Sequence, residues 1–201
     1  MNQRIGLFLT LCKWPVALLC ALLTPAAALL LLQEISLSTQ GMAYFWPLVG
    51  GGVAYLLVWH LWIRNTSVSF LSTLEHEITH CIFAWLTFNR VTGLRATLRE
   101  GGHMTYQGTG NWLLTIAPYF FPTVTVVLLL AMPFVDALGG VAMHAIIGAS
   151  MAYHGTSTWT ETHHAQTDLQ EAGFVFSFLF LPAANLLSFS LVFAALRAGW
   201  P

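Results

Sequence analysis

The sequence predicts an all-α, multi-pass membrane protein that carries one short β-hairpin. Composition is the first observation: 57% of the 201 residues are hydrophobic and only 7% are charged, whereas a soluble domain carries about 25% charged residues. The second is that the apolar residues gather in long runs separated by short polar segments. The third is a single polar stretch, residues 89–111, in which apolar and polar residues alternate. We expect residues 1–201 to form one integral-membrane domain.

The first apolar run, residues 14–32, predicts a retained membrane-spanning helix rather than a cleaved signal peptide. It is about 19 residues long, which exceeds a typical signal-peptide core and suffices to cross a bilayer. The second run, residues 43–63, ends in the sequence WHLWIRN, where Trp59, Trp62 and Arg64 are typical of a membrane interface.

Four further apolar runs complete a prediction of about six transmembrane helices. They are residues 67–88, 112–134, 138–155 and 172–196. We expect residues 67–197 to form the functional core of the protein. In this interpretation residues 1–64 contribute two additional N-terminal spans.

The alternating segment between the third and fourth runs, residues 91–106, predicts a membrane-associated β-hairpin with Gly101 and Gly102 at its middle. An amphipathic loop that lies on the lipid headgroups is the alternative. The fourth run contains Pro118 and Pro122. Because proline lacks a backbone N–H, we expect these residues to bend the fourth helix.

Three ionisable side chains occur together in the third apolar run, in the sequence LEHEITHCIF. His76 and His80 are four residues apart, so on a helix both imidazoles lie on one face and can bind one metal ion. Glu77 can then reach a water molecule on that metal, in the HExxH arrangement of zinc proteases. Zinc lowers the pKa of such a water to about 7, and the carboxylate accepts its proton. A buried polar network between helices is the alternative.

A third protein ligand is expected, because catalytic zinc has three protein ligands and one open position. The candidates lie in one His-rich polar segment: His154, Glu161, His163, His164, Asp168 and Glu171. We prefer Asp168, which we expect at the start of the last span, and keep His163 and His164 as alternatives. The pair of Asp168 and Glu171 also fits a helix-capping pattern.

The HEITH sequence in a predicted transmembrane helix, followed by a hairpin that contains GGHM, resembles the site-2 protease family of intramembrane zinc metalloproteases (peptidase family M50). The order of elements over residues 67–185 is also similar. The resemblance implies that His76, His80 and Asp168 bind one Zn²⁺ per chain and that Glu77 is the catalytic base. The chain has no Asp-Gly pair, which the family's usual second motif contains. It therefore resembles a small, divergent member without a PDZ domain.

The same resemblance implies a zinc metalloendopeptidase that cleaves membrane-embedded or membrane-associated substrates. The hairpin would bind an unwound substrate by strand addition, with Gly101, Gly102 and His103 in contact with it and Asn185 as a further substrate-binding residue. The expected partners are a membrane protein or peptide substrate, the lipid bilayer and an accessory or regulatory membrane protein. The net charge of −1 shows no excess of basic residues of the kind that binds nucleic acid. We expect a multi-pass protein of the bacterial inner membrane.

Two other functions fit parts of the same pattern. A metal-binding membrane transporter or sensor would use residues 154–164 as a metal entry site and Glu77 as a ligand or proton relay. An inactive relative would hold client helices without cleaving them. Glu77 separates the first two functions, because a protease needs it as a base but not for binding the metal.

Overall fold

The computed structural model of the protein describes residues 2–41, 45–65, 70–97, 101–135 and 137–198. Most of these residues are helical, and one two-stranded antiparallel sheet is also present. The chain divides into two compact units. Unit 1 comprises Met1–Thr24, Val68–Phe121 and Thr160–Asn185, and unit 2 comprises Pro25–Ser67, Pro122–Trp159 and Leu186–Pro201.

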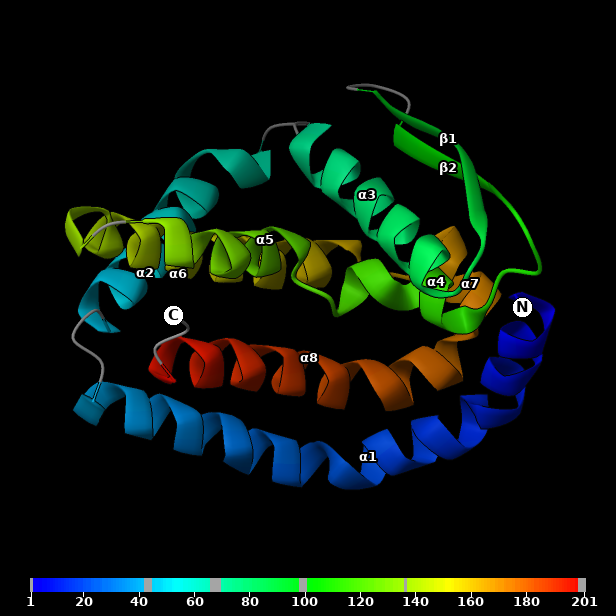
Figure 1. Ribbon diagram of the computed structural model, residues 1–201, viewed down its shortest axis with the longest axis horizontal. Helices are drawn as coiled ribbons and strands as arrows, with labels where there is room; N and C mark the ends of the chain where they lie inside the picture. The colour runs from blue at the N-terminus through cyan, green and yellow to red at the C-terminus, as the bar shows by residue number, and fades with distance from the viewer. Residues whose placement is uncertain (1, 42–44, 66–69, 98–100, 136, 199–201) are drawn as a thin grey trace. The chain divides into compact units, whose positions relative to one another are not determined.

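The helices overlap the apolar runs, and the strands overlap the alternating segment (Figure 1). In chain order the elements are α1 (Asn2–Gly41), α2 (Phe45–Leu61), η1 (Ile63–Asn65), α3 (Phe70–Leu86), β1 (Arg90–Thr97), β2 (Gly101–Gln107), α4 (Trp112–Ile116), η2 (Ala117–Tyr119), α5 (Thr123–Ala131), η3 (Met132–Phe134), α6 (Ala137–Glu161), α7 (Thr167–Ala172) and α8 (Phe174–Arg197), where η denotes a 3₁₀ helix.

The prediction of six transmembrane helices is too high for the residues that the structure describes. There, two helices, α1 and α8, are long and apolar enough to cross a membrane, and the bent α4–α5 region adds a third if it is one broken span. Each predicted span does contain a helix. However, α2 and α3 have only 17 residues each, fewer than the about 20 that a bilayer requires. Helix α6 is longer, but Gly, Ser, Thr and His interrupt its apolar sequence.

The β-hairpin is present where the alternating sequence predicted it. Strands β1 and β2 pair antiparallel, with Ala96 opposite Gly102 and Thr97 opposite Gly101. Gly101 and Gly102 therefore begin strand β2, in contrast to the expectation that they lie at the middle of the hairpin. The residues that connect the strands, 98–100, lie outside the described part of the chain.

Helix α3 lies along the hairpin (Figure 1). Met104 of β2 belongs to one apolar cluster with Cys81 and Ala84 of α3 and Leu114 of α4. Burial of these side chains holds the hairpin and α4 against α3, because removing apolar surface from water stabilises the contact. The packing places β2 beside the helix that carries the HExxH sequence.

The fourth apolar run is broken where its two prolines predicted a bend. Pro118 lies within η2, and Pro122 is the residue before α5. Neither proline can donate a backbone hydrogen bond, so a continuous helix is not maintained here. The break places Tyr119 in the core of unit 1, where it is fully buried in a cluster that includes Leu169 and Phe176.

A second break separates α7 from α8. Gly173 has a φ of 89°, a left-handed conformation that glycine adopts at no steric cost. Asp168 therefore lies on the short helix α7, in contrast to the expectation that it begins the last span. Gln166 is the N-cap residue of α7, so Asp168 does not cap the helix. Leu169 and Ala172 anchor α7 in the apolar core of unit 1.

Unit 2 has its own core and one buried ion pair. The core consists of the buried residues Leu48, Ile147, Val192 and Leu196. A Cβ atom at Gly148 would collide with the backbone of Leu48, so glycine allows α2 and α6 to approach closely. Arg197 lies 3.2 Å from the carboxylate of Glu34, which compensates this acidic group within the long apolar helix α1.

Candidate metal centre

Two histidines project from one face of α3. His76 and His80 are one helical turn apart, and the centroids of their rings are separated by 4.8 Å. His80 is buried, and the side chain of His76 is 14% exposed. The spacing of four residues therefore brings the two imidazoles together, because residues i and i+4 of a helix are neighbours.

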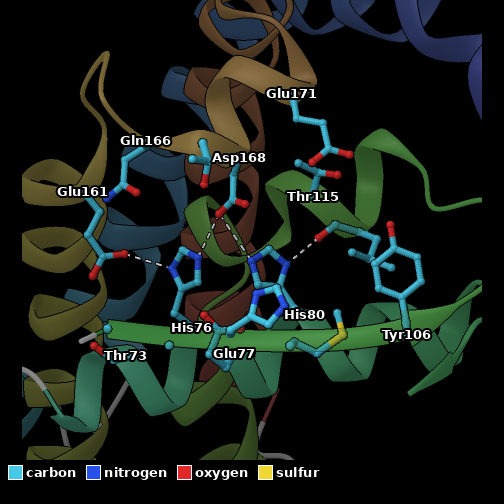
Figure 2. Close-up of a pocket in the computed structure, with 16 residues that line it drawn as sticks. Thr73, His76, Glu77, His80, Tyr106, Thr115, Glu161, Gln166, Asp168 and Glu171 are labelled. Atoms are coloured by element: carbon cyan, nitrogen blue, oxygen red, sulfur yellow. Dashed lines mark hydrogen bonds and ion pairs between the residues drawn. The ribbon is translucent and has the colours of Figure 1, made fainter. Parts of the chain in front are cut away.

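The carboxylate of Asp168 reaches both imidazoles from α7 (Figure 2). Its Oδ2 atom lies 3.0 Å from Nε2 of His76 and 3.3 Å from Nε2 of His80. One potential ligand atom from each of the three residues thus lies within 4.8 Å of the other two. The alternative ligands His163 and His164 are exposed between α6 and α7 and are not part of this group.

An oxygen acceptor holds each imidazole at its other nitrogen. Nδ1 of His76 lies 3.0 Å from Oε2 of Glu161, and Nδ1 of His80 lies 2.9 Å from the carbonyl oxygen of Leu114. Because a carbonyl or an ionised carboxylate only accepts hydrogen bonds, Nδ1 is the nitrogen that would keep a proton when the ring binds a metal. Nε2 is therefore the nitrogen of each ring that can bind a metal.

Tyr119 supports the third residue of the group. Its hydroxyl donates a hydrogen bond to Oδ2 of Asp168 at 3.2 Å, and its ring packs edge-on against His76 with centroids 5.4 Å apart. Burial raises the pKa of Asp168, but the hydrogen bonds with His76 and His80 and their charges lower it by more. The net pKa lies well below the ordinary value, so Asp168 is an ionised carboxylate, as a metal ligand must be.

The three side chains open onto a cavity of about 540 Å³ whose lining residues all belong to unit 1. The further polar residues in its wall are Thr73, Glu77, His103, Tyr106, Thr115, Glu161, Gln166, Thr167 and Glu171, most of which are labelled in Figure 2. Among the residues that the structure describes, no lysine or arginine lines it. A polar, acidic cavity of this kind admits water and favours a bound cation.

Glu77 lies between the two histidines in sequence and faces strand β2 in space. It is 7% exposed. A Cβ atom at Gly102 would lie 2.5 Å from Cγ and 2.7 Å from Oε1 of Glu77, and 2.7 Å from Cγ2 of Thr73. Glycine is therefore required for the observed approach of β2 to Glu77. Gly101, Gly102 and His103, the predicted substrate-binding residues of the hairpin, line the same cavity.

Asn185, also predicted to bind substrate, lies elsewhere in unit 1. Its side-chain amide donates hydrogen bonds to the carbonyl oxygen of Tyr119 at 2.9 Å and to that of Leu181 at 3.0 Å. It does not line the cavity. Asn185 instead ties α8 to η2 and so holds the backbone of the tyrosine that contacts Asp168.

Sequence reasoning did not find the residues that hold the histidines and Asp168 in place. It treated Glu161 only as a candidate ligand, whereas the structure places Glu161 at the far nitrogen of His76. Leu114 contributes a backbone carbonyl, which no side-chain pattern reveals. The only available signal is that Glu161 is an acidic residue in the same polar segment as Asp168.

The donor set fits a zinc ion. Two imidazole nitrogens and one ionised carboxylate are the ligand types of catalytic zinc sites, which keep a fourth position open. Both imidazoles also have the outer hydrogen-bond partner that metal-binding histidines almost always have. The open cavity beside the three ligand atoms leaves room for water and substrate.

Comparison with protein families matches residues 48–196 to the family described as Peptidase M50B-like. The matched range includes α3, the hairpin, α7 and nearly all of α8, and so every residue of the cavity wall. It begins within α2, before the core that the sequence predicted at residue 67. Comparisons with curated proteins and with solved structures found no match.

Proposed function

This chain belongs to the Peptidase M50B-like family, and on that premise we propose that it is a zinc metalloendopeptidase of the membrane. Its substrates would be membrane-embedded or membrane-associated polypeptides. The family and the apolar helices α1 and α8 support a membrane-bound peptidase. We further propose that it is a multi-pass protein of the bacterial inner membrane, with an accessory or regulatory membrane protein as a possible partner.

One observation carries the proposal. Nε2 of His76, Nε2 of His80 and a carboxylate oxygen of Asp168 converge within 4.8 Å, and the buried carboxylate of Glu77 lines the same cavity. This combination provides three ligands and a separate base, which hydrolysis assisted by a metal requires. In a metal-binding transporter or sensor the same carboxylate would be a ligand or a proton relay, and Glu77 is not part of the ligand group.

In the proposed mechanism, His76, His80 and Asp168 would hold the zinc ion. When bound, zinc acts as a Lewis acid that makes a water molecule nucleophilic near neutral pH and polarises the scissile carbonyl. Glu77 accepts a proton from the attacking water. It then returns this proton to the nitrogen of the leaving amine, so that the peptide bond and one water become a carboxylic acid and an amine.

The hairpin offers a way to hold the substrate. A peptide bond in a helix is protected because its amide is hydrogen-bonded within the helix, so the segment must unwind before cleavage. Residues Gly101 to Met104 of β2 line the cavity, and Gly102 lies beside Glu77. We propose that an unwound substrate segment pairs with the hairpin by strand addition, which places its backbone near the base.

The Glu77→Gln variant tests the proposed function. Glutamine keeps the shape of the side chain but cannot accept the proton, so we expect zinc content to stay the same and cleavage to fall by about 100-fold or more. Cleavage of candidate single-span substrates in membranes and zinc per chain are measured on the same preparation. Glu75→Gln, the same substitution at a residue outside the cavity wall, is the matched control and should retain cleavage.

The two functions give different results in this experiment. Full cleavage by Glu77→Gln would exclude Glu77 as the base. Loss of zinc together with activity would make Glu77 a ligand and would favour the metal-binding transporter or sensor.

A further inference from the structure

We propose that Glu161 is a positioning residue that fixes the orientation and the tautomer of His76 without binding the metal itself. The proposal rests on the proposed zinc site. The imidazole of His76 lies between two carboxylates, with Nδ1 3.0 Å from Glu161 and Nε2 3.0 Å from Asp168 (Figure 2). The two nitrogens of an imidazole point away from each other, so the two carboxylates occupy opposite sides of the ring and have different roles.

The geometry separates Glu161 from the ligands. The potential ligand atoms of His76, His80 and Asp168 lie within 4.8 Å of one another, and Glu161 is not part of that group. Its Oε2 atom instead faces the nitrogen of His76 that points away from the group. A carboxylate in this position accepts a hydrogen bond from Nδ1–H, so the proton stays on Nδ1 and the ring presents its Nε2 lone pair to the metal.

Ser72 holds the second oxygen of the same carboxylate. The Ser72 hydroxyl donates to Oε1 of Glu161 at 2.6 Å, while Oε2 faces His76. Ser72 and His76 are one turn apart on α3, so the carboxylate bridges two successive turns of this helix. Both oxygens are thus engaged with α3, which restricts rotation of the carboxylate and, through it, of the imidazole.

The two histidines depend on different kinds of support. His80 is held by the backbone carbonyl of Leu114, which a side-chain substitution cannot remove. At Nδ1, His76 is held by the side chain of Glu161 at the end of α6, seven residues before Asp168. A negative partner also makes the imidazole a stronger donor to a metal. The segment from Glu161 to Asp168 therefore supplies one proposed metal ligand, Asp168, and the residue that supports a second one, His76.

The test measures metal binding by the purified full-length protein and does not use cleavage. Zinc affinity is determined by competition with a chelator for wild type, Glu161→Gln, Glu161→Ala and Ser72→Ala. Loss of an outer hydrogen-bond partner of a metal-binding histidine typically weakens affinity about 10- to 100-fold. We expect Glu161→Ala to reach this range, Glu161→Gln to lose less because its amide oxygen still accepts, and Ser72→Ala to lose least.

The visible spectrum of the Co²⁺-substituted protein provides a second readout. It reports the geometry around the metal, and we expect it to change in Glu161→Ala and to be largely restored in Glu161→Gln. Glu171→Gln is the matched control: it removes one carboxylate from the same cavity wall, so it should lower zinc affinity less than Glu161→Ala and leave the cobalt spectrum unchanged.

Three outcomes would overturn the proposal. Wild-type affinity and spectrum in Glu161→Ala would show that Glu161 does not position His76. An equal loss in Glu171→Gln would show that the negative charge of the cavity, and not the contact with His76, is responsible. Failure of the wild type to bind zinc would overturn the proposed function as well, which distinguishes that failure from the first two.

Discussion

Asp168 contributes its carboxylate from a helix of only six residues. Substitutions can test whether Asp168 or a neighbouring histidine is the third metal ligand. We expect Asp168→Ala to lose most of its zinc, because it removes one of three ligands and leaves two imidazoles. His163→Ala should keep its zinc, since His163 is exposed and outside the ligand group. Zinc per chain in the purified variants is the measurement, and full occupancy in Asp168→Ala would refute this ligand assignment.

Tyr119 acts on the same carboxylate from the core. Tyr119→Phe removes only the hydroxyl that donates to Asp168 at 3.2 Å, so we expect zinc affinity to fall by up to about 10-fold with no loss of folded protein. Tyr55→Phe removes a comparable hydroxyl contact, to Thr156 at 3.0 Å in unit 2. This control should bind zinc like the wild type. Equal affinities for the wild type and Tyr119→Phe would show that Asp168 does not need the contact.

Among the elements, α3, α7 and the hairpin carry the site, and none of them is a candidate membrane span. Helix α3 has both apolar residues that pack against the hairpin and polar residues that face the cavity. Helix α7 is held by Leu169 and Ala172 in the core of unit 1. His76 pairs with both Glu161 and Asp168 within the cavity wall, which offsets the cost of burying these ionisable side chains.

The closeness of β2 to α3 makes a prediction about Gly102. We expect Gly102→Ala to reduce cleavage while zinc content stays the same, because the new methyl group would overlap Glu77 and Thr73 and push either the base or the strand aside. Gly155→Ala is the control, since a Cβ there meets nothing within 4 Å. Substrate cleavage and zinc content are measured for both variants. Wild-type cleavage by Gly102→Ala would show that the hairpin can move without cost.

At the scale of the whole molecule, a bound metal would connect α3 and α7, which are distant in the sequence. A ligand that binds only the folded state stabilises it by about 2.7 kcal/mol at a free concentration 100 times its Kd. We therefore expect a chelator to lower the thermal unfolding midpoint of the wild type and to have no effect on Asp168→Ala. Equal shifts in both proteins would mean that the chelator acts at another site.

The family match indicates a peptidase and the composition indicates a membrane protein, while the number of candidate spans among the described residues is lower than expected. Each apolar run predicts a span because hydropathy is an average of residue composition over a window. This average contains no information on where a helix begins or ends. Helices α2 and α3 have 17 residues each, so they are shorter than the apolar runs that contain them. The prolines of the fourth run were a usable signal, since η2 and the start of α5 mark the break.

The sequence by itself determined the features that depend on local periodicity. The spacing of His76 and His80 places both on one face of any helix that contains them. Alternation over residues 91–106 specifies strands because successive side chains of a strand point to opposite faces, and the hairpin is present there. Composition determined that this is a membrane protein, because a chain with few charged and many apolar residues is stable in a bilayer.

Only the tertiary structure decided which distant groups meet these histidines. Asp168 approaches His76 across 92 positions of the chain and Glu161 across 85. The position of Asp168 depends on the break at Gly173 and on how α7 packs in the core. The sequence offered six candidates in one polar segment and favoured Asp168 among them, but it gave no distance from any of them to the histidines. Long-range contacts follow from the packing of the whole unit, because no local pattern encodes the path of the chain between them.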